Sequence, residues 1–171
     1  YERVVMPQNC QSAEDYMRAR RVGRGGQLGR LQRKALWAAF AEYRALLAQN
    51  RLCEPEDAFR DACALIRQAD EKSARAGVPT EAGGLGIRCM VVDEAQDISA
   101  AAFELIRAAV PQNENDLFLV GDAHQRIYRH KVVLSKVGIN VRGRSRSLKV
   151  NYRTTDEIRQ WAVAVLKGCE I

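Results

Sequence analysis

The chain has 171 residues, is 47% hydrophobic and carries a formal net charge of +6 at pH 7. This length and apolar content suit one ordinary domain, or parts of two, and exclude wholesale disorder. Apolar runs such as CMVV and LFLV are far shorter than the roughly 20 residues of a membrane-spanning helix, so a membrane partner is not expected.

Cysteine and histidine are too few and too poorly spaced for a structural metal site or a disulfide framework. The number of cysteines is odd, and no two of them have C-x-x-C spacing. The cysteines are Cys10, Cys53, Cys63, Cys89 and Cys169, and the histidines are His124 and His130. We expect reduced thiols, several of them buried, in a cytoplasmic protein.

The first half of the chain predicts helices after a loop. Residues 1–29 are polar and basic and end in GRGGQLG, which indicates a loop or a poorly ordered lead-in. Residues 30–50 predict an amphipathic helix, and a second helix starts near Glu54. Residues 73–86 are rich in Gly, Ser, Pro and Thr and predict a linker. The expected apolar faces of the two helices carry Leu36, Phe40, Tyr43 and Leu47, and then Phe59, Ala62, Leu65 and Ile66.

After residue 86, short apolar strands alternate with helices. Ile87–Val92 and Asp116–Val120 predict strands, and Ala100–Val110 predicts a helix with Ser99 as its N-cap. Leu148–Val150 predicts a third strand. A last helix should start at Thr154, with Glu157 at capping-box spacing and a buried side made of Ile158, Trp161, Ala162 and Val165. This alternation predicts an α/β fold with a parallel sheet.

Acidic residues follow two of the predicted strands. Asp93 and Glu94 come directly after the first, and Asp122 follows the second. Ligands of open α/β sheets bind at the carboxyl ends of the strands. One acid there can hold Mg²⁺, another can orient or deprotonate a water that attacks a phosphate, and Gln125 can hydrogen-bond a phosphate or a water. Alone, D-E-x-x-D would indicate only an acidic helix N-terminus, but the second acidic strand end argues against that reading.

The excess positive charge is mostly arginine and lies in two clusters. The members are Arg18, Arg20, Arg21, Arg24, Arg30, Arg33 and Lys34 in the first, and Arg142, Arg144, Arg146, Lys149 and Arg153 in the second. Clusters of this kind either track a phosphate backbone or form a solvated basic face without a partner, and composition does not decide between these two readings.

Three segments resemble motifs of the UvrD/Rep-type superfamily 1A DNA helicases. VVDEAQD resembles their Walker B motif, GDAHQRIY their motif III and LKVNYRTTDEI their motif IV, in the family's order. The resemblance implies a partial RecA-like (P-loop NTPase) parallel sheet. It assigns residues 1–86 to a basic lead-in and a helical, domain 1B-like region, residues 87–141 to the second half of domain 1A, and residues 142–171 to the start of domain 2A.

The resemblance also implies roles in ATP hydrolysis. Asp93 would bind the Mg²⁺ of Mg-ATP, and Glu94 would be the catalytic base. Gln125 would sense the γ-phosphate and link it to DNA. Tyr152 would stack on the adenine, and Arg153 would be an arginine finger at the γ-phosphate.

Single-stranded or partly duplex DNA is the implied partner. Tyr128 stands where motif III aromatics meet single-stranded DNA. His130 and Lys131 replace the Trp and Arg that the family usually has, and His stacks on bases more weakly. The segment that carries Arg142, Arg144 and Arg146 would bind DNA phosphates if the resemblance holds. The alternative is that it forms a solvated loop.

The sequence contains no G-x-x-x-x-G-K-[ST] motif, and the family's motifs V and VI are also missing. We therefore expect a fragment, inactive alone, of an ATP-dependent helicase or translocase with 3′→5′ polarity, whose phosphate-binding loop lies upstream of Tyr1. One alternative is a non-enzymatic, degenerate module that binds nucleic acid or a protein partner through its arginines. Another is an ATPase of the same family that acts on RNA or on protein complexes.

Overall fold

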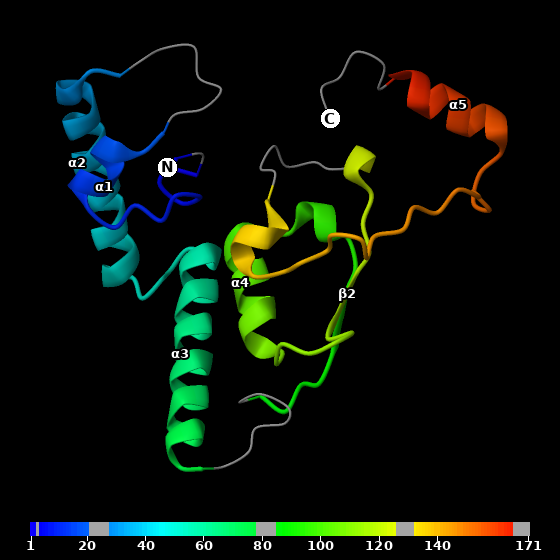
Figure 1. Ribbon diagram of the computed structural model, residues 1–171. Coiled ribbons are helices and arrows are strands. Elements are labelled where there is room, and N and C mark those ends of the chain that lie inside the picture. The colour runs from blue at the N-terminus through cyan, green and yellow to red at the C-terminus, as the bar shows by residue number, and fades with distance from the viewer. Residues whose placement is uncertain (3, 21–27, 78–84, 126–131, 166–171) are drawn as a thin grey trace. The chain divides into compact units, whose positions relative to one another are not determined.

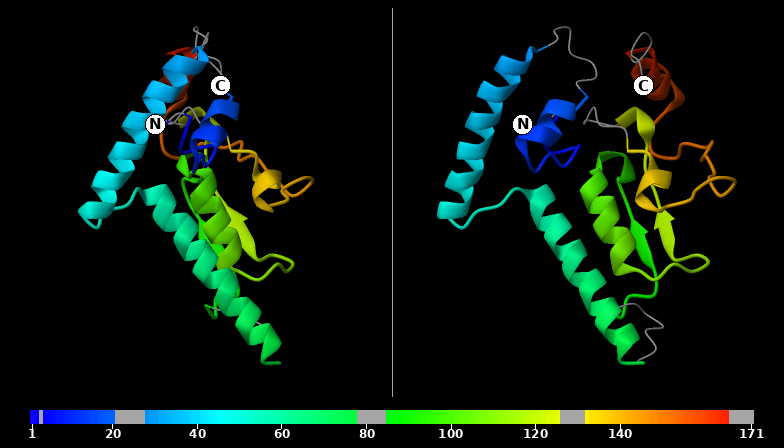
Figure 2. Two further views of the ribbon diagram at one scale, coloured as in Figure 1. Left: turned by 90° about the vertical axis from the view of Figure 1, so that its left-hand side faces the viewer. Right: turned by 60° about the vertical axis from the view of Figure 1, so that its left-hand side comes forward.

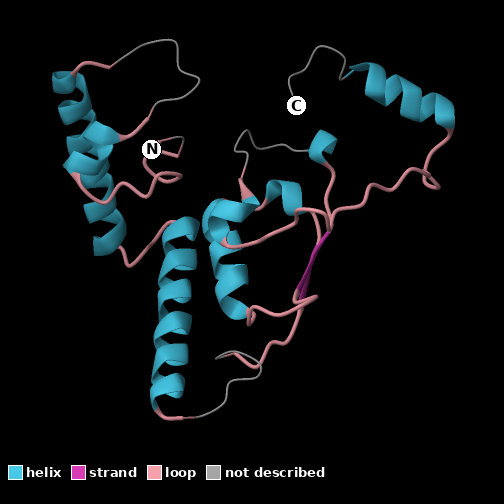
Figure 3. Cartoon of the chain, in the orientation of Figure 1, coloured by secondary structure: helices cyan, strands magenta, loops and turns pink. Residues whose placement is uncertain are grey.

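The computed structural model describes residues 1–2, 4–20, 28–77, 85–125 and 132–165 (Figure 1). The chain divides into two compact units, Tyr1–Asp61 and Ala62–Ile171. Helices predominate in the described residues, and two short strands lie in the C-terminal unit (Figure 3). None of the helices in these ranges combines the length and the apolar character that crossing a membrane requires.

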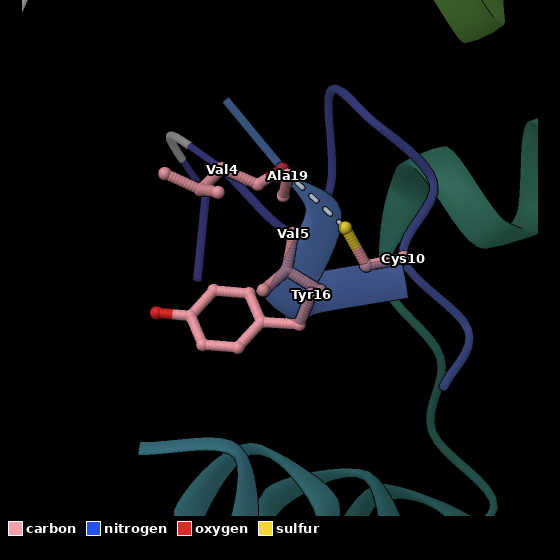
Figure 4. Close-up of a cluster of buried hydrophobic side chains, with 5 residues drawn as sticks. All are labelled: Val4, Val5, Cys10, Tyr16 and Ala19. Carbon is pink, nitrogen blue, oxygen red and sulfur yellow. Dashed lines mark hydrogen bonds between the residues drawn. The ribbon is translucent and has the colours of Figure 1, made fainter. Parts of the chain in front are cut away.

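The prediction of a loop or poorly ordered lead-in at residues 1–29 is wrong for residues 4–19, which form a small core and a helix. Its core is made of Val4, Val5, Cys10, Tyr16 and Ala19 (Figure 4). The helix α1 (Ala13–Arg18) begins after Ser12, whose hydroxyl accepts the N–H of Asp15 while the Asp15 carboxylate accepts the N–H of Ser12. This capping box satisfies two of the free N–H groups at the helix start. The helix has six residues, too few to show a helical period in the sequence.

The helix α2 (Arg30–Gln49) confirms the first predicted helix and packs on α1. Trp37 stacks on Tyr16 with ring centroids 5.9 Å apart, and Phe40 meets the same ring edge-on at 5.5 Å. One guanidinium nitrogen of Arg33 donates to the backbone carbonyls of Tyr16, Met17 and Ala19 at the end of α1. The predicted apolar face is only partly correct, because Leu36 and Tyr43 are exposed.

The helix α3 (Pro55–Arg75) begins where its proline and first-turn acids predict, and runs into the residues predicted as a linker. Cys63 and Ile66 are its buried residues. Leu65, which the sequence placed on the apolar face, is exposed. The buried side of α3 is therefore narrower than predicted.

A parallel strand pair organises the C-terminal unit. The strand β1 (Met90–Val92) pairs with β2 (Leu117–Leu119), and Val92 lies opposite Leu119. Between them runs α4 (Ala100–Ala109), capped at its start by the Ser99 hydroxyl as predicted. This β–α–β order confirms the predicted α/β parallel arrangement, although both strands are shorter than expected.

The two faces of the strand pair differ. Met90 and Leu117 pack against Ala109 and Val110 at the end of α4, and the views of Figure 2 show α4 alongside the strands. On the opposite face, Val91 is 71% exposed and Phe118 is 64% exposed. The continuous apolar runs of both strands are typical of a parallel sheet that is covered on both faces, but in this structure α4 covers one of them.

The predicted third strand is wrong. Leu148–Val150 is not a strand, and Leu148 is 94% exposed. The helix α5 (Asp156–Val165) begins two residues after Thr154, whose hydroxyl accepts a hydrogen bond from Asn151. Its predicted buried side is exposed, namely Ile158, Trp161, Ala162 and Val165. Apolar residues form a strand or a buried helix face only where a partner surface exists, and within the described residues these side chains remain exposed.

A buried ion pair connects α4 to β2. Arg107 donates to the carboxylate of Asp116 at 2.7 Å, and their side chains are 15% and 7% exposed. The same guanidinium nitrogen donates to the carbonyl of Val110. Burial by itself raises the pKa of Asp116, but hydrogen bonds from Arg107 and the Asn113 N–H, with the arginine charge, outweigh it and lower the pKa.

We predict that Asp116→Asn destabilises the chain by about 3 kcal/mol at pH 7, because it leaves Arg107 buried without its counter-charge. Since the pKa of Asp116 is lower in the folded than in the unfolded chain, its contribution is complete above about pH 4 and is lost as the pH falls through the folded-state pKa. The measurement is urea unfolding followed by circular dichroism at pH 7 and at several acidic values.

The control for this prediction is Glu114→Gln, a change at an exposed acid in the same loop. We expect it to leave the unfolding free energy within about 0.5 kcal/mol of the unaltered chain. The unaltered chain should lose more stability in acid than the Asp116→Asn variant does. An equal acid dependence in both proteins would show that Asp116 is not a stabilising charge.

Candidate active site

The ends of β1 and β2 bring two acidic segments to one edge of the strand pair. Val92 and Leu119 end the strands side by side, so Asp93–Glu94 and Gly121–Asp122 follow at the same edge. The N–H of Val120 donates to Val92 at 2.8 Å, and the N–H of Ala95 donates to Val120 at 2.9 Å. The backbone pairing thus continues past the strands and places the two acidic segments next to each other.

Glu94 occupies a left-handed backbone conformation, with φ 50° and ψ 38°. A residue with a side chain pays on the order of 1–2 kcal/mol for this conformation, and such residues gather at functional sites. The Glu94 N–H donates to the carboxylate of Asp93 at 2.8 Å. The 3₁₀ turn η1 (Ala95–Asp97) follows directly. The sharp turn ends β1 and presents the exposed carboxylates of Asp93 and Glu94 together at the strand end.

Gln96, which the sequence did not single out, connects the two acidic segments. Its amide nitrogen donates to the carboxylate of Glu94 at 2.6 Å, and its amide oxygen accepts the N–H of Asp122 at 3.0 Å. A Cβ atom on Gly121 would lie 2.6 Å from that amide oxygen and 3.2 Å from the N–H nitrogen of Ala95. Glycine at position 121 therefore permits the close approach of the two loops.

Asp122 organises the loop that follows β2. Its carboxylate accepts the N–H of His124 at 2.9 Å and the side-chain amide of Gln125 at 3.1 Å, and the His124 ring lies 3.2 Å away. The hydrogen bond from the His124 N–H is the largest cause that lowers the pKa of Asp122, and the Gln125 amide adds to it. Asp122 is therefore ionised at neutral pH and holds the short turn η2 (Ala123–Gln125).

The strand-end residues suit a magnesium–nucleotide complex rather than a metal held by protein alone. Among the described residues, no group of three or more His, Cys, Asp and Glu side chains could enclose a metal ion. Mg²⁺ in phosphoryl-transfer sites usually keeps several waters and takes one or two carboxylates plus phosphate oxygens. The exposed carboxylate of Asp93 fits that kind of ligand set.

Of the remaining predicted site residues, those that the structure describes are exposed. Tyr128 and His130 lie outside the described residues. Tyr152 is 93% exposed, and Arg153 is exposed with its N–H bonded to the Asn151 side chain at 2.9 Å. The exposed residues Arg142, Arg144 and Arg146 lie on a segment with a tight turn at Gly143, whose φ is 74°.

Comparison with known protein families matches this chain to one of them. The model of the UvrD/REP helicase N-terminal domain matches residues 6–134, which include both acidic strand ends and the helices before them. Searches of curated proteins and of solved structures gave no significant match. The family match covers well over half of the chain and agrees with the resemblance of VVDEAQD and GDAHQ in the sequence. The chain therefore belongs to the UvrD/Rep helicase family.

Proposed function

We propose that this chain is part of an ATP-dependent DNA helicase or translocase that couples ATP hydrolysis to 3′→5′ movement on single-stranded DNA. The observation that supports the proposal most is the meeting of Asp93–Glu94 with the Gly121–Asp122 loop at one edge of a parallel strand pair. Membership of the UvrD/Rep family supports the same activity. The partial RecA-like sheet would be completed, and the phosphate cradle supplied, from outside these 171 residues.

The chemistry assigned to the strand ends follows from the residue types. Asp93 would hold the Mg²⁺ that neutralises charge on the nucleotide phosphates. Glu94 would accept a proton from the attacking water, for which an exposed carboxylate next to the metal ligand is suited. Gln125 would hydrogen-bond the γ-phosphate, and its present bond to Asp122 places it in the same loop network.

The other nucleotide contacts are proposed from the family alone. Tyr152 would stack on adenine, and Arg153 would reach the γ-phosphate as an arginine finger. Both side chains are exposed, so each is accessible to a ligand. The family also supports a division of the chain into three regions. Residues 1–86 would form a basic lead-in and 1B-like region, residues 87–141 the second half of domain 1A, and residues 142–171 the start of domain 2A.

Nucleic acid binding is proposed on the arginine-rich segment and on motif III. Arg142, Arg144 and Arg146 are exposed. Arginines that do not fold back into the protein can neutralise phosphates of single-stranded DNA. Tyr128 and His130 would stack on its bases.

The described cysteines are free, which supports a reducing compartment such as the cytoplasm.

We predict that Glu94→Gln in the full-length protein lowers ATP turnover by roughly 10²–10⁴-fold, because the amide cannot accept the proton of the attacking water. Binding of Mg-ATP should persist, since the Mg²⁺ ligand Asp93 is unchanged. A phosphate-release assay gives the turnover, and a fluorescent nucleotide analogue gives the affinity. Glu114→Gln, at an exposed acid in the loop before β2, should hydrolyse ATP like the unaltered protein. Full turnover in Glu94→Gln would remove Glu94 from the mechanism.

We predict that the double change Arg144→Ala and Arg146→Ala weakens binding to an oligothymidine strand and reduces its salt dependence. Each lost phosphate contact should lower the slope of log affinity against log salt by about 0.7. Arg67→Ala with Arg75→Ala removes the same charge from the exposed surface of α3 and is the matched control. Equal slopes in the two double variants would indicate a solvated loop that does not touch DNA.

The two experiments also separate the proposed motor from its rival. A steep salt dependence of DNA binding, with no ATP hydrolysis by the unaltered full-length protein, would favour a non-enzymatic module that binds nucleic acid. Hydrolysis that RNA or a protein complex stimulates and DNA does not would favour a family ATPase with another target.

A further inference from the structure

The side-chain amide of Gln96 lies between the two loops of the candidate active site. It donates to the carboxylate of Glu94 at 2.6 Å and accepts the backbone N–H of Asp122 at 3.0 Å. We infer that Gln96 is a positioning residue, which holds the Glu94 carboxylate in place and fixes it to the Gly121–Asp122 turn. The catalytic consequence of this inference rests on the function proposed for Glu94.

The two contacts together determine the orientation of the Gln96 amide. Its oxygen must face the N–H of Asp122, because that group can only donate, and its nitrogen must face Glu94, because an ionised carboxylate can only accept. A flipped amide would place two donors together at Asp122 and two acceptors together at Glu94. The side chain at position 96 therefore needs both a hydrogen-bond donor and an acceptor at its tip. Ionised glutamate offers only acceptors, and methionine and leucine offer no strong hydrogen-bonding group.

The surrounding backbone leaves this amide little freedom. Gly121 lies so close that a Cβ atom there would be 2.6 Å from the Gln96 amide oxygen. The N–H of Ala95 donates to the carbonyl of Val120, so the backbone directly before Gln96 is also bonded to the end of β2. Beyond Asp122, the network continues through its carboxylate to the Gln125 amide at 3.1 Å. Gln96 thus joins the loop that carries Glu94 to the loop that carries Gln125.

Positioning matters for Glu94 because its carboxylate is exposed and ends a flexible side chain. An unrestrained carboxylate would sample several rotamers, and only some of them would face the attacking water. A misplacement of about 1 Å can lower a catalytic rate on the order of 10²-fold. The bond between Gln96 and Glu94 lies at the surface, so its loss should alter the melting temperature little.

The first test is steady-state ATP hydrolysis by the full-length protein with Gln96→Ala and with Gln96→Glu. Gln96→Glu keeps an acceptor for Asp122 but replaces the donor to Glu94. We expect kcat to fall on the order of 10²-fold in both variants, while KM for ATP and nucleotide affinity stay unchanged. Gln112→Ala, at an exposed glutamine before β2, is the control and should behave like the unaltered protein. Unchanged kcat in both Gln96 variants would overturn the inference.

The second test asks whether Gln96 acts through Glu94. Gln96→Ala is combined with Glu94→Gln, and the residual turnover is measured under single-turnover conditions. If Gln96 positions the Glu94 carboxylate, the added change should have almost no effect once that carboxylate is gone. A further loss as large as the one that Gln96→Ala causes in the unaltered protein would show that Gln96 does not act through Glu94. A purely structural defect would give this additive loss.

A third test does not depend on ATP hydrolysis. Hydrogen exchange and side-chain amide signals are followed by NMR in the 171-residue chain. Gln96→Ala should speed exchange of the Asp122 N–H, and Glu94→Ala should shift the side-chain amide signals of Gln96. If neither change occurs, the inference fails whatever the kinetics show. If both occur but the unaltered full-length protein hydrolyses no ATP, the proposed function fails while the contact made by Gln96 is supported.

Discussion

The parallel pairing of β1 with β2 determines where the acidic groups of this chain lie. Parallel strands need a crossover between them, and α4 provides it by packing on one face of the pair. Because the strands run in the same direction, the residues that follow each strand meet at one edge. This backbone geometry brings Asp93–Glu94 and Gly121–Asp122 together, although Gln96 and Asp122 are 26 positions apart in the chain. The Arg107–Asp116 ion pair fixes the other end of the arrangement, where α4 leads into β2.

The two loops at the edge depend on each other at close range. Glu94 takes a left-handed conformation that ends β1 sharply, and Gly121 admits the Gln96 amide against the start of the second loop. Strain and close approach are stabilised here by hydrogen bonds that cross between the loops. Such a site would orient the proposed base Glu94 and the proposed phosphate-binding amide of Gln125 relative to each other, as phosphoryl transfer requires. Family membership agrees with that chemistry, and the Gln96 contact adds a means by which one loop restrains the other.

The sequence predicted the elements whose pattern is long or whose chemistry is local. The helices of residues 30–50 and 100–110, the Ser99 cap and the two acidic strand ends could all be read from periodicity, cap residues and apolar runs. The predictions failed where a short element depends on contacts distant in sequence. The helix α1 has too few residues for a period. Leu148–Val150 and the apolar side of α5 are exposed among the described residues, where no covering surface buries them. Gln96 was missed because an uncharged amide in an acidic motif has no chemical signal of its own until its neighbours in space are known.

We propose that the acidic strand ends belong to a DNA-dependent ATPase motor. The most direct test is Mg-ATP hydrolysis by the unaltered full-length protein, measured with and without single-stranded DNA. We expect magnesium-dependent turnover that single-stranded DNA stimulates. A folded full-length protein that binds single-stranded DNA but hydrolyses no ATP, with or without that DNA, would contradict the proposed motor function.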